Sequence, residues 1–146
     1  MDNINYDTYL LSVLQFVTEG REVVIPVKGN SMLPFIVGGV DHVALSRCNE
    51  ISVGDIVLAN TDEKGYVIHR VDNIGEDGRV SLLGDGNLQM REHCSRNNVL
   101  AMVTHVIRPG GKRVSMQSRK AVALGRMWRM LLPVRKYLLK IYKKIH

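Results

Sequence analysis

Near the start of the chain, apolar and polar positions repeat at helical spacing. Within residues 7–19, apolar residues recur every three or four positions, with polar residues between them: Leu10, Val13, Leu14 and Val17. A repeat with this period predicts one short amphipathic helix. The helix is too short to cross a bilayer, which requires about 20 apolar residues.

The next part of the chain consists of short, β-branched apolar stretches separated by Gly, Asp and Asn. The first covers residues 23–27 and ends at a turn formed by Lys28-Gly29-Asn30. Five more stretches follow: residues 42–46, 56–60, 66–71, 80–83 and 99–107. Regularly spaced short strands with turn signals, and no helical period between them, predict a mostly β fold in which an antiparallel sheet curls like a barrel.

The end of the chain returns to a helical period. Pro109-Gly110-Gly111 closes the β part. Beyond it, apolar residues recur at steps of three and four: Leu124, Met127, Trp128, Leu131, Val134, Leu138, Ile141 and Ile145. This pattern predicts an amphipathic C-terminal helix, interrupted by Arg135 and by Pro133, a residue that can kink a helix. We therefore divide the chain into a β domain, residues 1–109, and a helical tail, residues 110–146.

Charge separates the same two parts. The 146 residues are 45% hydrophobic and 23% charged, which is ordinary for one globular domain. The formal net charge is +6, but twelve of the 20 Lys and Arg residues and none of the 14 Asp and Glu residues lie from Arg108 onward. The molecule therefore has an acidic body and a basic tail.

No residue pattern indicates a metal, a redox pair or a membrane span. Cys48 and Cys94 fit neither a metal spacing nor a CxxC motif, so we expect free thiols, and a disulfide between them stays open. His93, His105 and His146 have no ligand spacing, and we expect no metal and no cofactor. The N-terminus lacks the features of an export signal, and no apolar window is long enough for a span.

The segment around Ser31 carries the candidate chemistry. A serine hydroxyl is a weak nucleophile at neutral pH, so a reactive serine must be held in a turn beside a base, where backbone amides can meet an oxyanion. Gly29 before Ser31 and Pro34 after it suit such a turn. Taken alone, a serine in this position indicates only loop polarity.

Four sequence blocks, in order, resemble one superfamily. Gly29-Asn30-Ser31-Met32-Leu33-Pro34 resembles the nucleophile motif of type I signal peptidases and of the self-cleaving SOS-repressor peptidases. Three further blocks match the superfamily's later motifs: Val53-Gly54-Asp55-Ile56-Val57, Tyr66-Val67-Ile68-His69-Arg70-Val71 and Leu83-Gly84-Asp85-Gly86-Asn87. The resemblance implies the curled β fold of these peptidases over residues 1–109. It also implies that Ser31 is the nucleophile and that its backbone amide helps to hold the oxyanion.

The second candidate residue is the general base. Most bacterial signal peptidases and the SOS-type peptidases have lysine where this chain has His69, whereas the endoplasmic-reticulum and archaeal type, also found in some bacteria, has histidine. The resemblance therefore implies a Ser31 and His69 pair of the histidine-base subtype. Imidazole titrates near neutral pH and needs only correct geometry to act as a base, whereas lysine must first be desolvated.

An acid that orients the imidazole would complete the site. Our candidate is Asp85, although it is equally a turn residue between Gly84 and Gly86. Histidine-type relatives carry a second acid a few residues further on, about where this chain has Arg91. The third member is thus Asp85, Glu92 or absent.

These residues predict a serine endopeptidase that cleaves a leader, signal or propeptide segment, bound in extended conformation along a strand edge near Ser31. The alternative is a catalytically inactive module of the same fold that binds peptide or a membrane surface. A self-cleaving repressor is disfavoured, because only about twenty residues precede the first strand and leave no room for a DNA-binding domain.

The basic tail predicts a membrane contact. Residues 112–146 would attract anionic headgroups through their cations, with Trp128, Met127 and the leucines embedded at the interface. The alternative is that the helix packs its apolar stripe on the β body. Nucleic acid is disfavoured as a partner because the tail has few aromatic residues for stacking. We expect a cytoplasmic bacterial protein, peripheral on the inner membrane face if the tail binds there.

Overall fold

The computed structural model describes residues 3–86 and 90–145. Asn87, which ends the last sequence block, and His146 lie outside the described residues. Along the chain the elements are α1 (Asn3–Thr18), β1 (Val23–Pro26), β2 (His42–Ser46), β3 (Ile56–Thr61), β4 (Gly65–Ile74), β5 (Arg79–Leu83), β6 (Glu92–Ser95), η1 (Arg96–Asn98), β7 (Val99–Ile107), β8 (Arg113–Ser115), α2 (Arg119–Met130), η2 (Leu132–Val134) and α3 (Arg135–Ile145).

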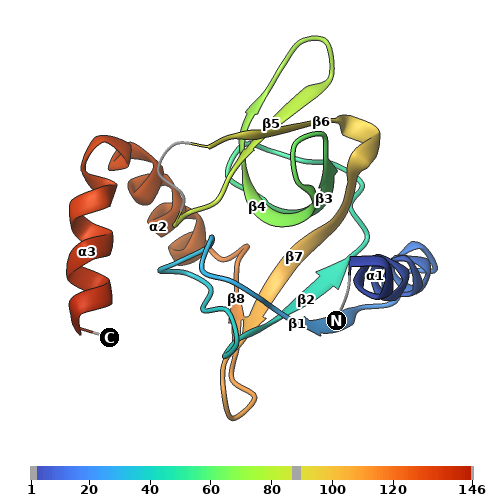
Figure 1. The fold of residues 1–146 in the computed structure, drawn as a ribbon, viewed down its shortest axis with the longest axis horizontal. Helices are drawn as coiled ribbons and strands as arrows, with labels where there is room; N and C mark the ends of the chain where they lie inside the picture. Colours follow the sequence, from blue (N-terminus) through green and yellow to red (C-terminus); the bar gives the residue numbers. More distant parts are fainter. Residues whose placement is uncertain (1–2, 87–89, 146) are drawn as a thin grey trace.

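Within the described residues the strands form one eight-stranded sheet. Its order is β1-β2-β7-β3-β4-β5-β6, with β8 also paired to β7, and every pair is antiparallel. The sheet curls between α1 on one side and α2 and α3 on the other (Figure 1). The predicted mostly β, curled antiparallel fold with a short N-terminal helix and helical C-terminus is confirmed.

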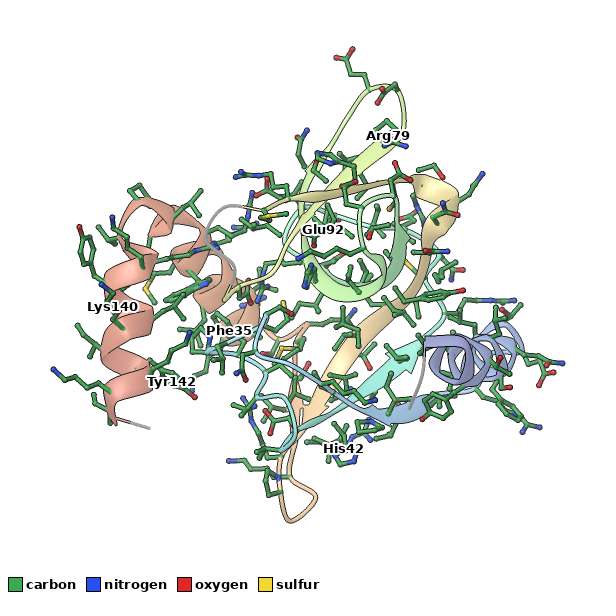
Figure 2. The ribbon with its side chains drawn as sticks, in the orientation of Figure 1. Phe35, His42, Arg79, Glu92, Lys140 and Tyr142 are labelled. Atoms are coloured by element: carbon green, nitrogen blue, oxygen red, sulfur yellow. The ribbon has the colours of Figure 1, made fainter. Side chains whose placement is uncertain are left out.

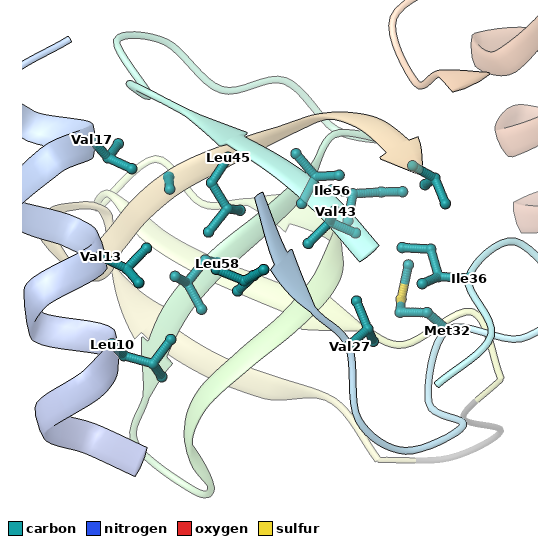
Figure 3. Packing of buried hydrophobic residues seen from close by; sticks show 14 residues of the cluster. Leu10, Val13, Val17, Val27, Met32, Ile36, Val43, Leu45, Ile56 and Leu58 are labelled. Atoms are coloured by element: carbon teal, nitrogen blue, oxygen red, sulfur yellow. The ribbon is translucent and has the colours of Figure 1, made fainter. Parts of the chain in front are cut away.

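The main core joins α1 to the loop that carries Ser31. Leu10, Val13 and Val17 point from α1 toward the strands, as the helical period predicts (Figure 3). From the other side of the same cluster, Met32 and Ile36 enter next to the Ser31 turn (Figure 3). Because residues of α1 and of the Ser31 loop are buried in the same cluster, this core holds the segment after β1 against the sheet.

A second core fixes the strands that carry the other candidate residues. It lies between β3, β4, β5, β6 and β7 and consists of Val57, Ala59, Val71, Val80, Leu82, Cys94, Val99 and Met102. Cys94 is buried in it, and both Cys48 and Cys94 are free. Strand β5 lies between β4 and β6 in the sheet, and residues of all three strands pack in this core.

The C-terminal segment is divided where the sequence suggested one interrupted helix. α2 ends at Met130, and α3 begins at Arg135 after the single turn η2, which contains Pro133. Proline lacks an N–H group and disfavours a continuous helix, which accounts for the break. Strand β8 pairs with β7, so residues after Pro109 also extend the sheet.

After this division, some apolar residues of the C-terminal helices are buried and others are exposed. Trp128 and Leu139 are buried against Leu33, a residue of the Ser31 turn.

In the described part of the chain, no helix is both long enough and apolar enough to pass through a bilayer.

Candidate active site

Ser31 lies in a tight turn that follows β1. Gly29 precedes it with φ of 77°, a left-handed conformation that favours glycine. The amides of Phe35 and Ile36 both donate to the Met32 carbonyl at 3.0 Å, which closes the turn. The Met32 side chain is buried, whereas Ser31 is half-buried. Packing of its neighbour therefore anchors the serine while its hydroxyl stays accessible.

The Gly84–Gly86 turn packs directly on this loop. The Gly86 N–H donates to the Ser31 carbonyl at 2.8 Å. A Cβ on Gly84 would come within 2.4 Å of that carbonyl and 3.1 Å of His69 Nε2, and a Cβ on Gly86 would lie 2.5 Å from the Asn30 carbonyl. The two backbones approach so closely that only glycine fits at either position.

His69 faces Ser31 from strand β4. It pairs with Val57 of β3 and is 3% exposed. Its Nε2 lies 3.0 Å from Ser31 Oγ, within hydrogen-bond distance. The structure thus brings together the two residues that the sequence blocks singled out, although 38 positions separate them.

Glu92 lies on the other side of the His69 ring. It is the first residue of β6, opposite Leu82 of β5, and is completely buried within the curl of the sheet (Figure 2). Its Oε1 makes a short contact with His69 Nδ1. Its Oε2 has no hydrogen-bond partner among the described residues, but Lys64 Nζ lies 4.0 Å away.

The Glu92 contact sets the tautomer of His69. An ionised carboxylate can only accept, so the imidazole carries its proton on Nδ1 and presents the Nε2 lone pair to the Ser31 hydroxyl. Burial lowers the pKa of His69 below its ordinary value, and the charge and hydrogen bond of Glu92 oppose this effect only in part. His69 is therefore neutral at physiological pH, the form that can accept a proton.

Asp85 lies away from this pair, in a separate buried network. Its two carboxylate oxygens accept from Arg70 Nε and Nη2 at 2.8 and 2.7 Å. Its carbonyl accepts from Trp128 Nε1 at 2.9 Å. Of the three alternatives that the sequence left open, the carboxylate that touches His69 is that of Glu92, and Asp85 instead joins the Ser31-facing turn to Arg70 and α2.

The roles of three residues in this region were not predicted from the sequence. Arg70 follows His69 on β4. Because consecutive side chains of a strand point to opposite faces, the sequence block itself indicated that Arg70 does not share the face of His69. Lys64 lies between β3 and β4, far from Glu92 in sequence, and only the tertiary fold brings its Nζ to 4.0 Å from the Glu92 carboxylate. Trp128 belongs to the apolar stripe of the tail, and nothing in that pattern distinguishes it from its exposed neighbours.

A small hollow opens beside the Ser31 hydroxyl. It has a volume of about 140 Å³ and is lined by the end of β1 and by Tyr66–His69 of β4, together with Lys28, Ser31, Met32 and Leu58. Among the residues that the structure describes, β1 pairs with β2 alone, and β4 pairs with β5 only from Arg70 onward. Two strand edges therefore border the hollow.

The fold and the cluster define a class of protein. A curled antiparallel sheet that holds a serine, a neutral histidine and a carboxylate in a chain of contacts has the parts of a serine peptidase. A family described as Peptidase S24-like matches residues 1–107, and the chain belongs to this family. The comparison with curated proteins found no match. The matched part ends with β7, before the C-terminal helices.

Proposed function

We propose that this protein is a serine endopeptidase of the histidine-base subtype, which cleaves a leader, signal or propeptide segment. The observation that carries the proposal is the continuous chain from Ser31 Oγ through His69 to Glu92. We assign the orienting role to Glu92 in place of Asp85, because Glu92 contacts His69 Nδ1 whereas both Asp85 oxygens are engaged by Arg70.

In the first half of the reaction, Ser31 Oγ attacks the scissile carbonyl while its proton passes to His69 Nε2. Glu92 stabilises the imidazolium that forms. The backbone N–H of Ser31 donates to the developing oxyanion. When the tetrahedral intermediate collapses, the C–N bond breaks and His69 gives its proton to the leaving amine.

In the second half, water replaces the released amine. Neutral His69 takes a proton from the water as the water oxygen attacks the acyl carbon. Collapse of this intermediate breaks the bond to Ser31 Oγ, and His69 returns the proton to the serine. The products are a new carboxylate, a new amine and the starting enzyme.

The strand edges beside the hollow favour an extended substrate. A peptide strand could pair with the free edge of β4 at Tyr66–His69 while its other edge faces the end of β1, which would lay a scissile bond over Ser31. A hollow of about 140 Å³ has room for a small side chain next to that bond. We therefore expect the enzyme to prefer small residues at the cleavage site.

The test is the pH dependence of Ser31 acylation by an electrophilic fluorophosphonate probe. In the wild-type protein, labelling should rise with pH through the lowered pKa of His69 and then level off, because only the neutral imidazole accepts the proton. Ser31→Ala should abolish labelling, and His69→Gln should reduce it by at least about a hundredfold. Ser12→Ala, at an exposed position on α1, is the matched control and should label like wild type.

Two outcomes decide against the proposal. Equal labelling of Ser31→Ala and wild type would place the reactive group elsewhere. A folded wild-type protein that never labels, yet binds an extended peptide, would identify a non-catalytic peptide-binding module instead.

A further inference from the structure

Helix α3 contacts the body through one face only. Arg135 and Leu139 are buried, and Tyr142 packs partly against the same small core as Trp128. Figure 2 shows Tyr142 on the side of α3 that faces the body. At about 100° per residue these three positions lie together on the helix surface.

A second face of α3 and the turn before it is apolar and uncovered. Its residues are 36–74% exposed and recur at helical spacing: Val134, Tyr137, Leu138, Ile141 and Ile145. We call this set the α3 stripe. On the helix surface it is centred about 100° away from the buried face. The β body therefore does not cover it. Of the apolar residues that the sequence pattern grouped in the tail, Trp128 is buried and Leu131 packs partly against the same small core, whereas the α3 stripe stays exposed.

The remaining face of α3 is cationic. Lys136, Lys140, Lys143 and Lys144 are all exposed, and the chain has no Asp or Glu from Arg108 onward. Elsewhere in the described residues, tail cations pair with acids of the body, as in Arg113–Glu22 at 2.8 Å and Arg129–Asp72 at 3.8 Å. No ion pair involves the α3 lysines within the part of the chain that the structure describes.

We propose that α3 docks on an anionic membrane surface, with the α3 stripe inserted at the headgroup boundary and its lysines on the lipid phosphates. An exposed apolar row beside unpaired lysines is what such a surface binds, because burial of the stripe and attraction to negative headgroups add together. The surface differs from the sequence-based one in a particular way: Trp128 is buried and donates to Asp85, so it does not take part.

Two hydrogen bonds connect α3 to the candidate active site. Arg135 Nε donates to the Trp128 carbonyl at 3.1 Å, and Trp128 Nε1 donates to the Asp85 carbonyl in the turn that packs on Ser31. Docking through α3 would therefore hold Ser31 at a fixed position relative to the membrane. The docking itself does not depend on whether Ser31 is reactive.

The experiment is flotation of the full chain with two kinds of vesicle. One kind is phosphatidylcholine alone, and the other contains roughly one third phosphatidylglycerol. Wild type should float with the anionic vesicles at low ionic strength, stay behind with the neutral ones, and be released in part by about 0.5 M salt. Vesicle flotation measures binding without any substrate, so its outcome is separate from that of the acylation test.

Two variants test the two components of the surface. Glutamine replaces the side chains because it keeps helix propensity. The first variant combines Val134→Gln, Ile141→Gln and Ile145→Gln. The second combines Lys140→Gln, Lys143→Gln and Lys144→Gln. Each should lower partitioning onto anionic vesicles by at least about tenfold, with an unchanged unfolding midpoint because the altered side chains are exposed.

A matched control changes three apolar residues of similar exposure on the body: Val24→Gln, Val40→Gln and Ile74→Gln. It should float like wild type. The proposal is overturned if wild type does not bind anionic vesicles, or if the control loses as much binding as the stripe variant. It is also overturned if wild type is a dimer that ignores vesicles and becomes a monomer on loss of the α3 stripe, because a second copy would then cover it.

Discussion

At the scale of single residues, the site depends on burial. His69 and Glu92 are almost inaccessible, and burial penalises the charged form of His69. Burial of the Glu92 carboxylate costs free energy, because its second oxygen has no hydrogen bond among the described residues. The contact with His69 and the nearby Lys64 offset this cost. The same burial keeps His69 neutral, which is the property a general base requires.

Glu92→Gln should slow acylation of Ser31 by about two to four orders of magnitude, because an amide neither fixes the tautomer nor stabilises the imidazolium. It should also shift the acidic limb of the pH profile to lower pH, since Glu92 raises the pKa of His69. Acylation rates measured across pH would show both effects. Glu63→Gln, which removes the exposed partner of His93, is the control and should leave the profile unchanged.

The lowered pKa of His69 also predicts how stability depends on pH. As pH falls through about 6.5, the unfolded chain takes up a proton on this residue while the folded chain does not. The contribution of His69 to stability is therefore complete above that pH and decreases as pH drops toward the folded pKa. Urea unfolding of wild type and His69→Gln at several pH values should show a smaller loss at acidic pH in the variant.

The matched comparison is His42→Gln, which removes an exposed histidine from β2. If the two variants lose stability in parallel on acidification, His69 is not the residue responsible.

At the scale of elements, close contact between loops positions the reactive group. The Ser31 turn and the Gly84–Gly86 turn meet through backbone atoms, with Met32 Sδ also accepting from the Asp85 amide at 3.4 Å. The Arg70–Asp85 pair joins this contact to strand β4. The serine therefore sits on a rigid support although it belongs to a loop.

Gly84→Ala tests this support. The new methyl group would lie 2.4 Å from the Ser31 carbonyl, so one of the two turns must move. We expect acylation to fall by at least about tenfold while the protein stays folded, since a displacement of about 1 Å is enough to disturb such a reaction. Acylation kinetics together with circular dichroism would separate the two effects. Wild-type kinetics in the variant would show that the turns are not in tight contact.

At the scale of the whole molecule, the C-terminal helices pack against the part of the chain that the family match covers. The match ends at Ile107, yet Trp128 of α2 donates to Asp85 and packs with Phe35 at a centroid distance of 6.1 Å. Gly125 lies so close to Arg70 that a Cβ would approach Nη1 to 2.8 Å. The helices thus cover the buried network behind Ser31.

A chain that ends at Ser118 should be less stable than wild type by about 2–4 kcal/mol, because it exposes the surface buried by Trp128 and Leu139. Its acylation should also be slower, since the Asp85 carbonyl loses its donor. A chain that ends at Val134 keeps Trp128 and should fall between the two. Thermal unfolding and probe labelling of the three chains would test this order, and equal stabilities would contradict it.

Several features of this protein follow from local sequence. The periods of the apolar residues predict α1, the strands and the helical C-terminus, because burial of one face imposes those periods. The order of the four blocks and their resemblance to one superfamily imply that Ser31 and His69 form a pair. Each block is a short segment whose turn or strand is specified by its own glycines, prolines and β-branched residues.

Tertiary structure decided which carboxylate touches His69 and which tail residues are buried. Asp85 and Glu92 are both acids near the end of β5, and only the β5–β6 pairing places Glu92 at Nδ1 and leaves Asp85 to Arg70. Likewise, the break at Pro133 lets Trp128 and Leu139 turn inward while the α3 stripe stays exposed. A periodic pattern tells which residues share a face, but the partner of that face depends on contacts between segments distant in sequence.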